Sequence, residues 1–106
     1  MIQKLKVTEF ILQINYIIRE NLKIINNSLK KIEKISGYTY DRKDTGRRET
    51  GLVAQEVLEI LPEAINKDNE DYYNISYGNM SGLLVEGIKE LNERLTRIEN
   101  YLFYNN

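Results

Sequence analysis

The 106-residue sequence contains no cysteine, no histidine and no tryptophan. Structural zinc and iron–sulfur clusters are held by thiolates and imidazoles, so neither kind of metal centre is expected, and nothing else in the sequence indicates a metal or cofactor. Disulfide and thiol chemistry are excluded for the same reason, and so is general-base catalysis by histidine. The missing cysteines leave the redox compartment open.

Long apolar runs are also missing. No stretch approaches the ~20 apolar residues that a transmembrane helix needs, and the first seven residues lack the apolar core of a signal peptide. We therefore expect a soluble protein without a membrane partner. Hydrophobic residues make up 42% of the chain and charged residues 29%, which favours a folded chain, and its length suits a single domain.

Charge is spread unevenly although the net charge is only −1. Residues 1–50 hold eleven Lys and Arg against six Asp and Glu, whereas residues 51–106 hold four against ten. Two interpretations stay open: two solvated faces, or two halves that attract each other within or between chains. A nucleic-acid partner is not expected, because the basic residues follow a helical pattern and do not cluster with exposed aromatic residues.

Residues 1–36 are predicted to form a helical arm. The apolar residues that recur at intervals of 3, 4 and 3 are Leu22, Ile25, Leu29 and Ile32. This spacing is typical of an amphipathic helix, and Gly37 is placed to end it. Further upstream the spacing favours a helix that begins near Thr8, while the β-branched residues in 10–18 leave a strand as the alternative.

Residues 37–76 are predicted to form a module of two β-ribbons around a short helix. The first ribbon would pair residues 38–40 with 52–54, and the second would pair 64–65 with 72–76. Between them residues 55–61 suit a helix of about two turns. Pro62, the only proline, would end this helix, because the residue before a proline is pushed out of helical space.

The tip of the first ribbon, residues 41–49, is polar and carries Gly46 in a turn. Four basic residues fall within seven positions: Arg42, Lys43, Arg47 and Arg48. We expect this tip to be exposed and mobile and to contact a client protein or a fibre stalk.

The last predicted helix, residues 77–103, carries the clearest periodicity. Its apolar residues are spaced 4, 3, 4, 3 and 4: Leu84, Ile88, Leu91, Leu95, Ile98 and Leu102. This is a heptad repeat, in which Ile88, Leu95 and Leu102 occupy position a and the other three occupy position d. Arg94 at g and Glu99 at the following e have the interchain ion-pair spacing of a parallel coiled coil. The mixture of Ile and Leu is compatible with two or three strands.

No enzyme site is indicated by the residue pattern. The sequence has neither a glycine-rich phosphate loop nor a nucleophile elbow. The acidic residues in 68–71 lack the glycine and the final glutamate of an EF-hand loop, so they are interpreted as a solvated turn. The eight tyrosines are interpreted as packing at an interface rather than stacking on bases.

Several segments together resemble a known family. Its motif of G-hydrophobic-hydrophobic-A-Q-E/D-V followed by P-E matches Gly51, Ala54, Gln55, Glu56, Val57 and Pro62. Its helix with the pattern L-L-hydrophobic-E-A-I-K-E-L matches residues 83–91, where Gly87 departs from it, as Gly82 does just before. These segments resemble the intramolecular chaperone domain of phage endosialidases, tail spikes and neck appendages, over about residues 14–103.

The resemblance implies a homotrimer that forms through the last helix. It also implies self-release, in which the family cuts the peptide bond before a serine of a Ser-Asp-x-x-x-Lys motif. Here the matching positions are Ile14, Asn15 and Arg19, so the hydroxyl nucleophile is missing and a guanidinium replaces the base. No serine of this chain has a lysine five residues later. Only thirteen residues precede Ile14, from which we expect a stand-alone chain without an attached fibre.

The sequence therefore predicts a single α+β domain with an N-terminal helix, small β-ribbons around a short helix, and a long C-terminal helix in a parallel, three-stranded coiled coil. We expect a non-enzymatic, homotrimeric assembly domain of the viral fibre type, in the host cytoplasm or the virion, whose partners are itself and a structural protein. Two alternatives remain: a self-cleaving peptidase-type domain with a misaligned site, and a generic coiled-coil adaptor.

Overall fold

The computed structural model describes residues 19–68 and 72–104. It is mixed α/β, with two small antiparallel hairpins and a long C-terminal helix. The described elements are α2 (Ser28–Ile32), β1 (Tyr38–Asp41), β2 (Arg48–Gly51), α3 (Ala54–Ile60), η1 (Pro62–Ala64), β3 (Ile65–Lys67), β4 (Tyr73–Ile75), η2 (Tyr77–Met80) and α4 (Ser81–Tyr104). The helix expected from Thr8 lies outside the described residues.

The helical arm is much shorter than predicted. Only Ser28–Ile32 is helical between residues 19 and 37, so the helix expected from Leu22 to Gly37 is wrong at both ends. Asn21 and Asn27 have φ of 55° and 50°, a left-handed conformation that no α-helix can contain, and residues 19–27 are not helical. Glu33 rather than Gly37 is the C-terminal cap.

The first hairpin exists, but its second strand is placed earlier than predicted. β1 pairs with β2, so that Tyr38 lies opposite Gly51 and Asp41 lies opposite Arg48. Residues 52–54 do not pair with it. The carbonyl of Val53 accepts the first hydrogen bonds of α3, from the N–H groups of Glu56 and Val57, which draws this segment into the helix.

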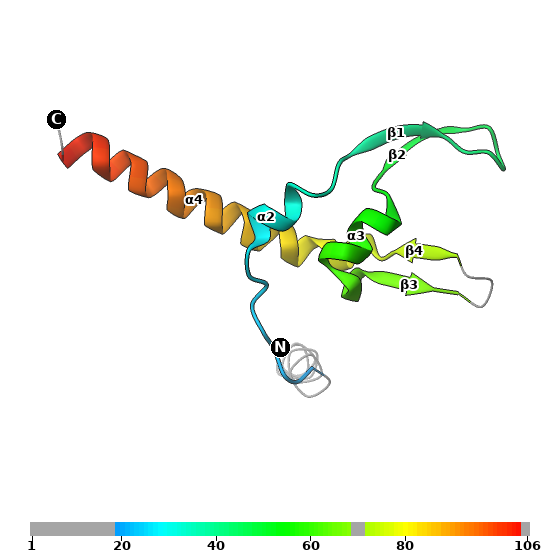
Figure 1. Cartoon of the computed structure of the whole chain (residues 1–106), viewed down its shortest axis with the longest axis horizontal. Helices are drawn as coiled ribbons and strands as arrows, with labels where there is room; N and C mark the ends of the chain where they lie inside the picture. The colour runs from blue at the N-terminus through cyan, green and yellow to red at the C-terminus, as the bar shows by residue number, and fades with distance from the viewer. Residues whose placement is uncertain (1–18, 69–71, 105–106) are drawn as a thin grey trace, which may run out of the picture.

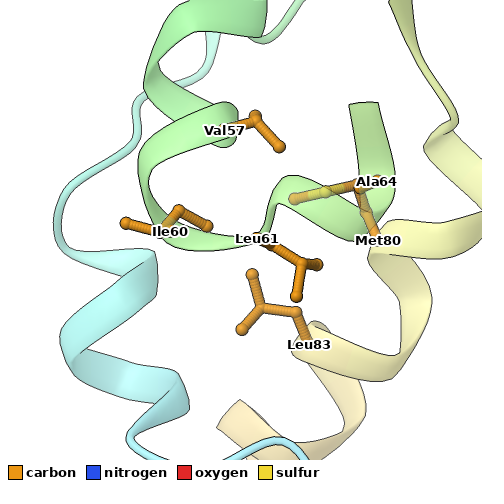
Figure 2. Packing of buried hydrophobic residues seen from close by; sticks show 6 residues of the cluster. All are labelled: Val57, Ile60, Leu61, Ala64, Met80 and Leu83. Atoms are coloured by element: carbon orange, nitrogen blue, oxygen red, sulfur yellow. The ribbon is translucent and has the colours of Figure 1, made fainter. Parts of the chain in front are cut away.

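A small core forms where α3, η1, η2 and the first turn of α4 meet (Figure 2). Its buried side chains are Val57, Ile60, Leu61, Ala64, Met80 and Leu83. Val57, Ile60 and Leu61 point into this core, whereas their neighbour Leu58 is only half-buried. Pro62 begins η1 directly after α3, as expected of a helix-ending proline.

The second hairpin lies where it was predicted, with strands over 65–67 and 73–75 in place of 64–65 and 72–76. β3 pairs with β4, with Ile65 opposite Ile75 and Lys67 opposite Tyr73. Ser76 N–H donates a further hydrogen bond to the Ala64 carbonyl at 2.8 Å and closes the base of the hairpin on η1. The chain then turns through η2 into α4, which begins four residues later than expected because residues 77–80 form a 3-10 turn.

Figure 1 shows the arrangement. The two hairpins and α3 gather at the N-terminal end of α4, α2 lies across the side of α4, and the rest of α4 projects away from the module. The fold therefore anchors one end of a long helix, and within the described part of the chain most of the length of this helix has no partner.

Candidate functional site

The projecting part of α4 carries a continuous apolar stripe. Its members are half or more exposed: Leu84 51%, Ile88 68%, Leu91 56%, Leu95 54%, Ile98 55% and Leu102 53%. These are the six residues that the heptad spacing places at a and d, and we call them the seam. Exposed apolar surface that runs over several turns marks an interaction site in a folded protein. The two flanking residues Arg94 and Glu99 are exposed beside it.

A face of α4 beside the seam packs against α2. Leu83 and Gly87, both buried, and the half-buried Glu90 lie at heptad positions c, g and c, next to the seam rather than on it. The Glu90 carboxylate accepts the backbone N–H groups of Ser28 and Leu29, each at 2.8 Å. The first N–H groups of a helix have no partner inside it, so Glu90 supplies the missing acceptors from another element. No spacing or composition signal indicates this contact in advance.

Gly87 is part of the same contact. A Cβ added there would lie 2.5 Å from Ile32 Cδ1, closer than real Cβ contacts come. A second helical glycine, Gly82, faces Ile25 Cδ1 at 3.4 Å from its would-be Cβ. Gly82 and Gly87, which both differ from the family's helix motif, are thus the positions at which the arm approaches α4. The close approach accompanies a cost, because glycine weakens a helix by about 1 kcal/mol relative to alanine.

Residues of the G-L-V-A-Q-E-V motif hold the segments around α3 together. Glu56 accepts hydrogen bonds from the hydroxyl of Tyr38 at 2.7 Å and the N–H of Ser36 at 3.2 Å. The bond to Glu56 raises the pKa of Tyr38 above its ordinary value. Glu56 therefore ties α3 to the link between α2 and β1, whereas its sequence neighbour Gln55 is exposed.

Gly51 has a role of its own in this motif. The Tyr77 hydroxyl accepts the N–H of Leu52 at 3.2 Å. It can come this close because Gly51 has no side chain: a Cβ there would lie 2.6 Å from the Tyr77 oxygen and 3.4 Å from that of Tyr40. The remaining motif residues serve the helix itself, since Ala54 begins α3 and Val57 is fully buried in the core.

The four basic residues of the first hairpin tip are exposed, but two of them are paired. Arg42 binds Asp44 through two hydrogen bonds, at 2.9 and 2.7 Å, and lies 3.8 Å from Glu49. Hydrogen bonding to Asp44 raises the pKa of Arg42, and the same contact lowers the pKa of Asp44. Arg48 lies 3.3 Å from Asp41. Much of the positive charge at this tip is therefore balanced by its own carboxylates.

Lys43 and Arg47 complete the tip, and both are exposed. They lie at the turn between the strands, where Gly46 has a φ of 71° that other residues rarely adopt.

Of the three positions that match the family's cleavage motif, Ile14 and Asn15 lie outside the described residues. Arg19 is exposed and lines an open hollow together with Glu63, Asn79 and Ser81, among others. Among residues 19–68 and 72–104 no cluster of three or more carboxylates could hold a metal ion. In the same part of the chain, no helix has the length and apolarity needed to cross a membrane.

Comparison with known proteins gives a consistent result. Residues 18–66 match the sequence profile of the family described as "Chaperone of endosialidase". Over this segment the chain is similar to the endosialidase chaperone family. The matched segment contains α2, both strands of the first hairpin, α3 and η1, and so most of the core.

Similar curated proteins are long tail fibre proteins of phages. The Gp37 protein of Enterobacteria phage M1 is 34% identical over 87 residues, which cover 74% of this chain and 35% of that protein. The Gp37 proteins of phages K3 and T2 are each 33% identical over 94 residues, covering 80% of this chain but 8% and 7% of those proteins. The chain thus spans 35% or less of the length of these relatives.

Proposed function

We propose that this protein is a fibre-associated assembly domain that forms a homotrimer through α4. The observation that carries the proposal is the seam, whose six apolar side chains are half or more exposed and left uncovered by residues 19–68 and the rest of 72–104. A coiled coil with other copies would bury them, and the Arg94-to-Glu99 spacing favours parallel chains. The relatives in phage tail fibres and the chaperone family support a viral structural protein as client.

The proposed action is to bring three chains into register. A parallel coiled coil aligns its members residue by residue, because each a and d side chain packs into one hole of its neighbour. The short arm, the hairpins and the core at the base of α4 would then be presented three times around one axis. The first hairpin tip, with Lys43 and Arg47 at its turn, is the surface we propose for contact with a client or stalk.

Self-cleavage is not part of the proposal. Attack on a peptide bond needs a nucleophile and a base that can take its proton. Ile14 offers no such group and the guanidinium of Arg19 stays protonated. We therefore propose that the domain is not an enzyme and either acts on a separate fibre protein or persists as a structural part of the virion.

Light scattering of the purified chain at micromolar concentration tests the proposal. One chain has a mass of 12.5 kDa, and we expect a particle three times as heavy, about 37 kDa. A mass of two chains would retain the coiled coil and reject the trimer. A single-chain mass would reject the seam as an interface.

A further inference from the structure

A polar contact between α2 and α4 joins segments far apart in sequence, and the assembly role leaves it unused. The two oxygens of Glu90 accept the N–H groups of Ser28 and Leu29, which are 62 and 61 residues away. We propose that Glu90 is a positioning residue that latches α2 to the flank of α4 and so fixes where the arm leaves the helix. For a trimer, this inference rests on the proposed function.

Two further features of this contact point to a docking site for α2. Ser28 is fully buried, and its hydroxyl donates to the Ile25 carbonyl at 3.3 Å, so both its N–H and its hydroxyl are hydrogen-bonded. Gly87 leaves room for Ile32, whose Cδ1 would lie 2.5 Å from a Cβ added at Gly87. On α4 the contact uses Glu90 at position c and Gly87 at position g, so the docked arm leaves the a and d seam open to other copies.

The latch depends on the charge of Glu90. Hydrogen bonds from the N–H groups of Leu29 and Ser28 lower the pKa of this carboxyl below its ordinary value, with Lys31 adding to the effect. The other charged groups around it are Lys30 of α2 and Glu93, Arg94 and Arg97 of α4. A carboxyl whose pKa is lower in the folded state stabilises the fold at pH values above its ordinary pKa of about 4.3. This stabilisation is lost as the pH falls through the pKa of the folded state.

Hydrogen exchange of the full chain at pH 7 tests the latch. In Glu90→Gln one oxygen is replaced by an NH2 group, which cannot accept a hydrogen bond and faces a backbone donor. The amides of Ser28 and Leu29 should then exchange about tenfold faster or more. Glu93→Gln, which makes the same charge change one turn away on an exposed position, is the matched control and should exchange as the wild type does.

A pH titration followed by amide NMR separates a latch from a general structural role. In the wild type and in Glu93→Gln, the chemical shifts of the Ser28 and Leu29 amides should change together as the pH falls below about 4.3. In Glu90→Gln they should not change in this way. Unchanged exchange in Glu90→Gln, or titration that persists in it, would overturn the inference.

Particle mass is measured on the same samples. We expect Glu90→Gln to keep the mass of the wild type, since the latch lies outside the seam. Loss of assembly in this variant alone would overturn the separation of latch and seam. If the wild type is monomeric but its Ser28 and Leu29 amides still exchange more slowly than those of Glu90→Gln, the proposed trimer is rejected. The latch is retained in that case, because its contacts lie within one chain.

Discussion

A charge in the middle of the seam should abolish assembly. Full burial of a Leu or Ile side chain contributes about 1.5–3 kcal/mol. Each seam side chain still exposes between 51% and 68% of its surface, so covering it gains about 0.8–2 kcal/mol, and all six gain about 5–10 kcal/mol per chain. Association itself costs about 4–15 kcal/mol, so assembly depends on most of these contacts.

Leu95→Glu removes one of these contacts from every chain and places like charges around one axis. Losing the apolar contact and desolvating the carboxylate cost together at least ~2 kcal/mol per chain, or ~6 kcal/mol per trimer. This corresponds to roughly 10⁴-fold weaker assembly, enough to give monomers at micromolar concentration.

The assay is light scattering on a sizing column, with circular dichroism to follow helix content. Asn100→Glu adds the same charge to the same helix at an exposed f position and should keep the wild-type mass. If Leu95→Glu retained the wild-type mass, the seam would not be the interface.

Further outcomes follow from other parts of the chain. Limited trypsin digestion should cut first within residues 42–48, because exposed loop tips are the preferred sites of proteolysis; a first cut inside α4 would contradict the assembled seam. Gly82→Ala should raise the midpoint of thermal unfolding, by up to ~1 kcal/mol in stability, because its Cβ meets Ile25 at an ordinary 3.4 Å; a lower midpoint would contradict this. Gly87→Leu should instead displace α2 and speed exchange at Ser28, and wild-type exchange would refute the close packing. A fusion behind a fibre stalk should stay intact on a denaturing gel, and a discrete cut beside position 14 would refute the loss of cleavage.

The elements that sequence pattern predicted well are those whose signal is local. The heptad of α4 needs no partner to be recognised, and the exposure of its a and d residues agrees with the spacing. The short helix α3 is bounded by Pro62, and the second hairpin is marked by alternation and a polar turn. In each case the periodicity of one segment decided its structure.

The failures have a different origin. The apolar spacing of residues 22–32 fits a helix, yet Asn27 at a φ of 50° breaks it and the surviving turn is capped by Glu90 from the far end of the chain. A carboxylate on a helix is normally solvated, so residue type and helical spacing did not reveal the contacts of Glu56 and Glu90, although both lie in segments that match the family motifs. Tertiary contacts of this kind override local pattern and leave no periodic trace.

The two kinds of contact on α4 divide its surface in a way that suits assembly. A single chain uses hydrogen bonds to a carboxylate and a glycine contact to hold α2, both of which require one geometry. The seam, by contrast, offers only apolar surface, which is attractive to any partner that can cover it. If the arm had docked through apolar side chains on the seam, it would compete with other copies of α4. Because the arm is held by Glu90 on the flank instead, the fold can be complete in one chain while the seam stays open for its copies.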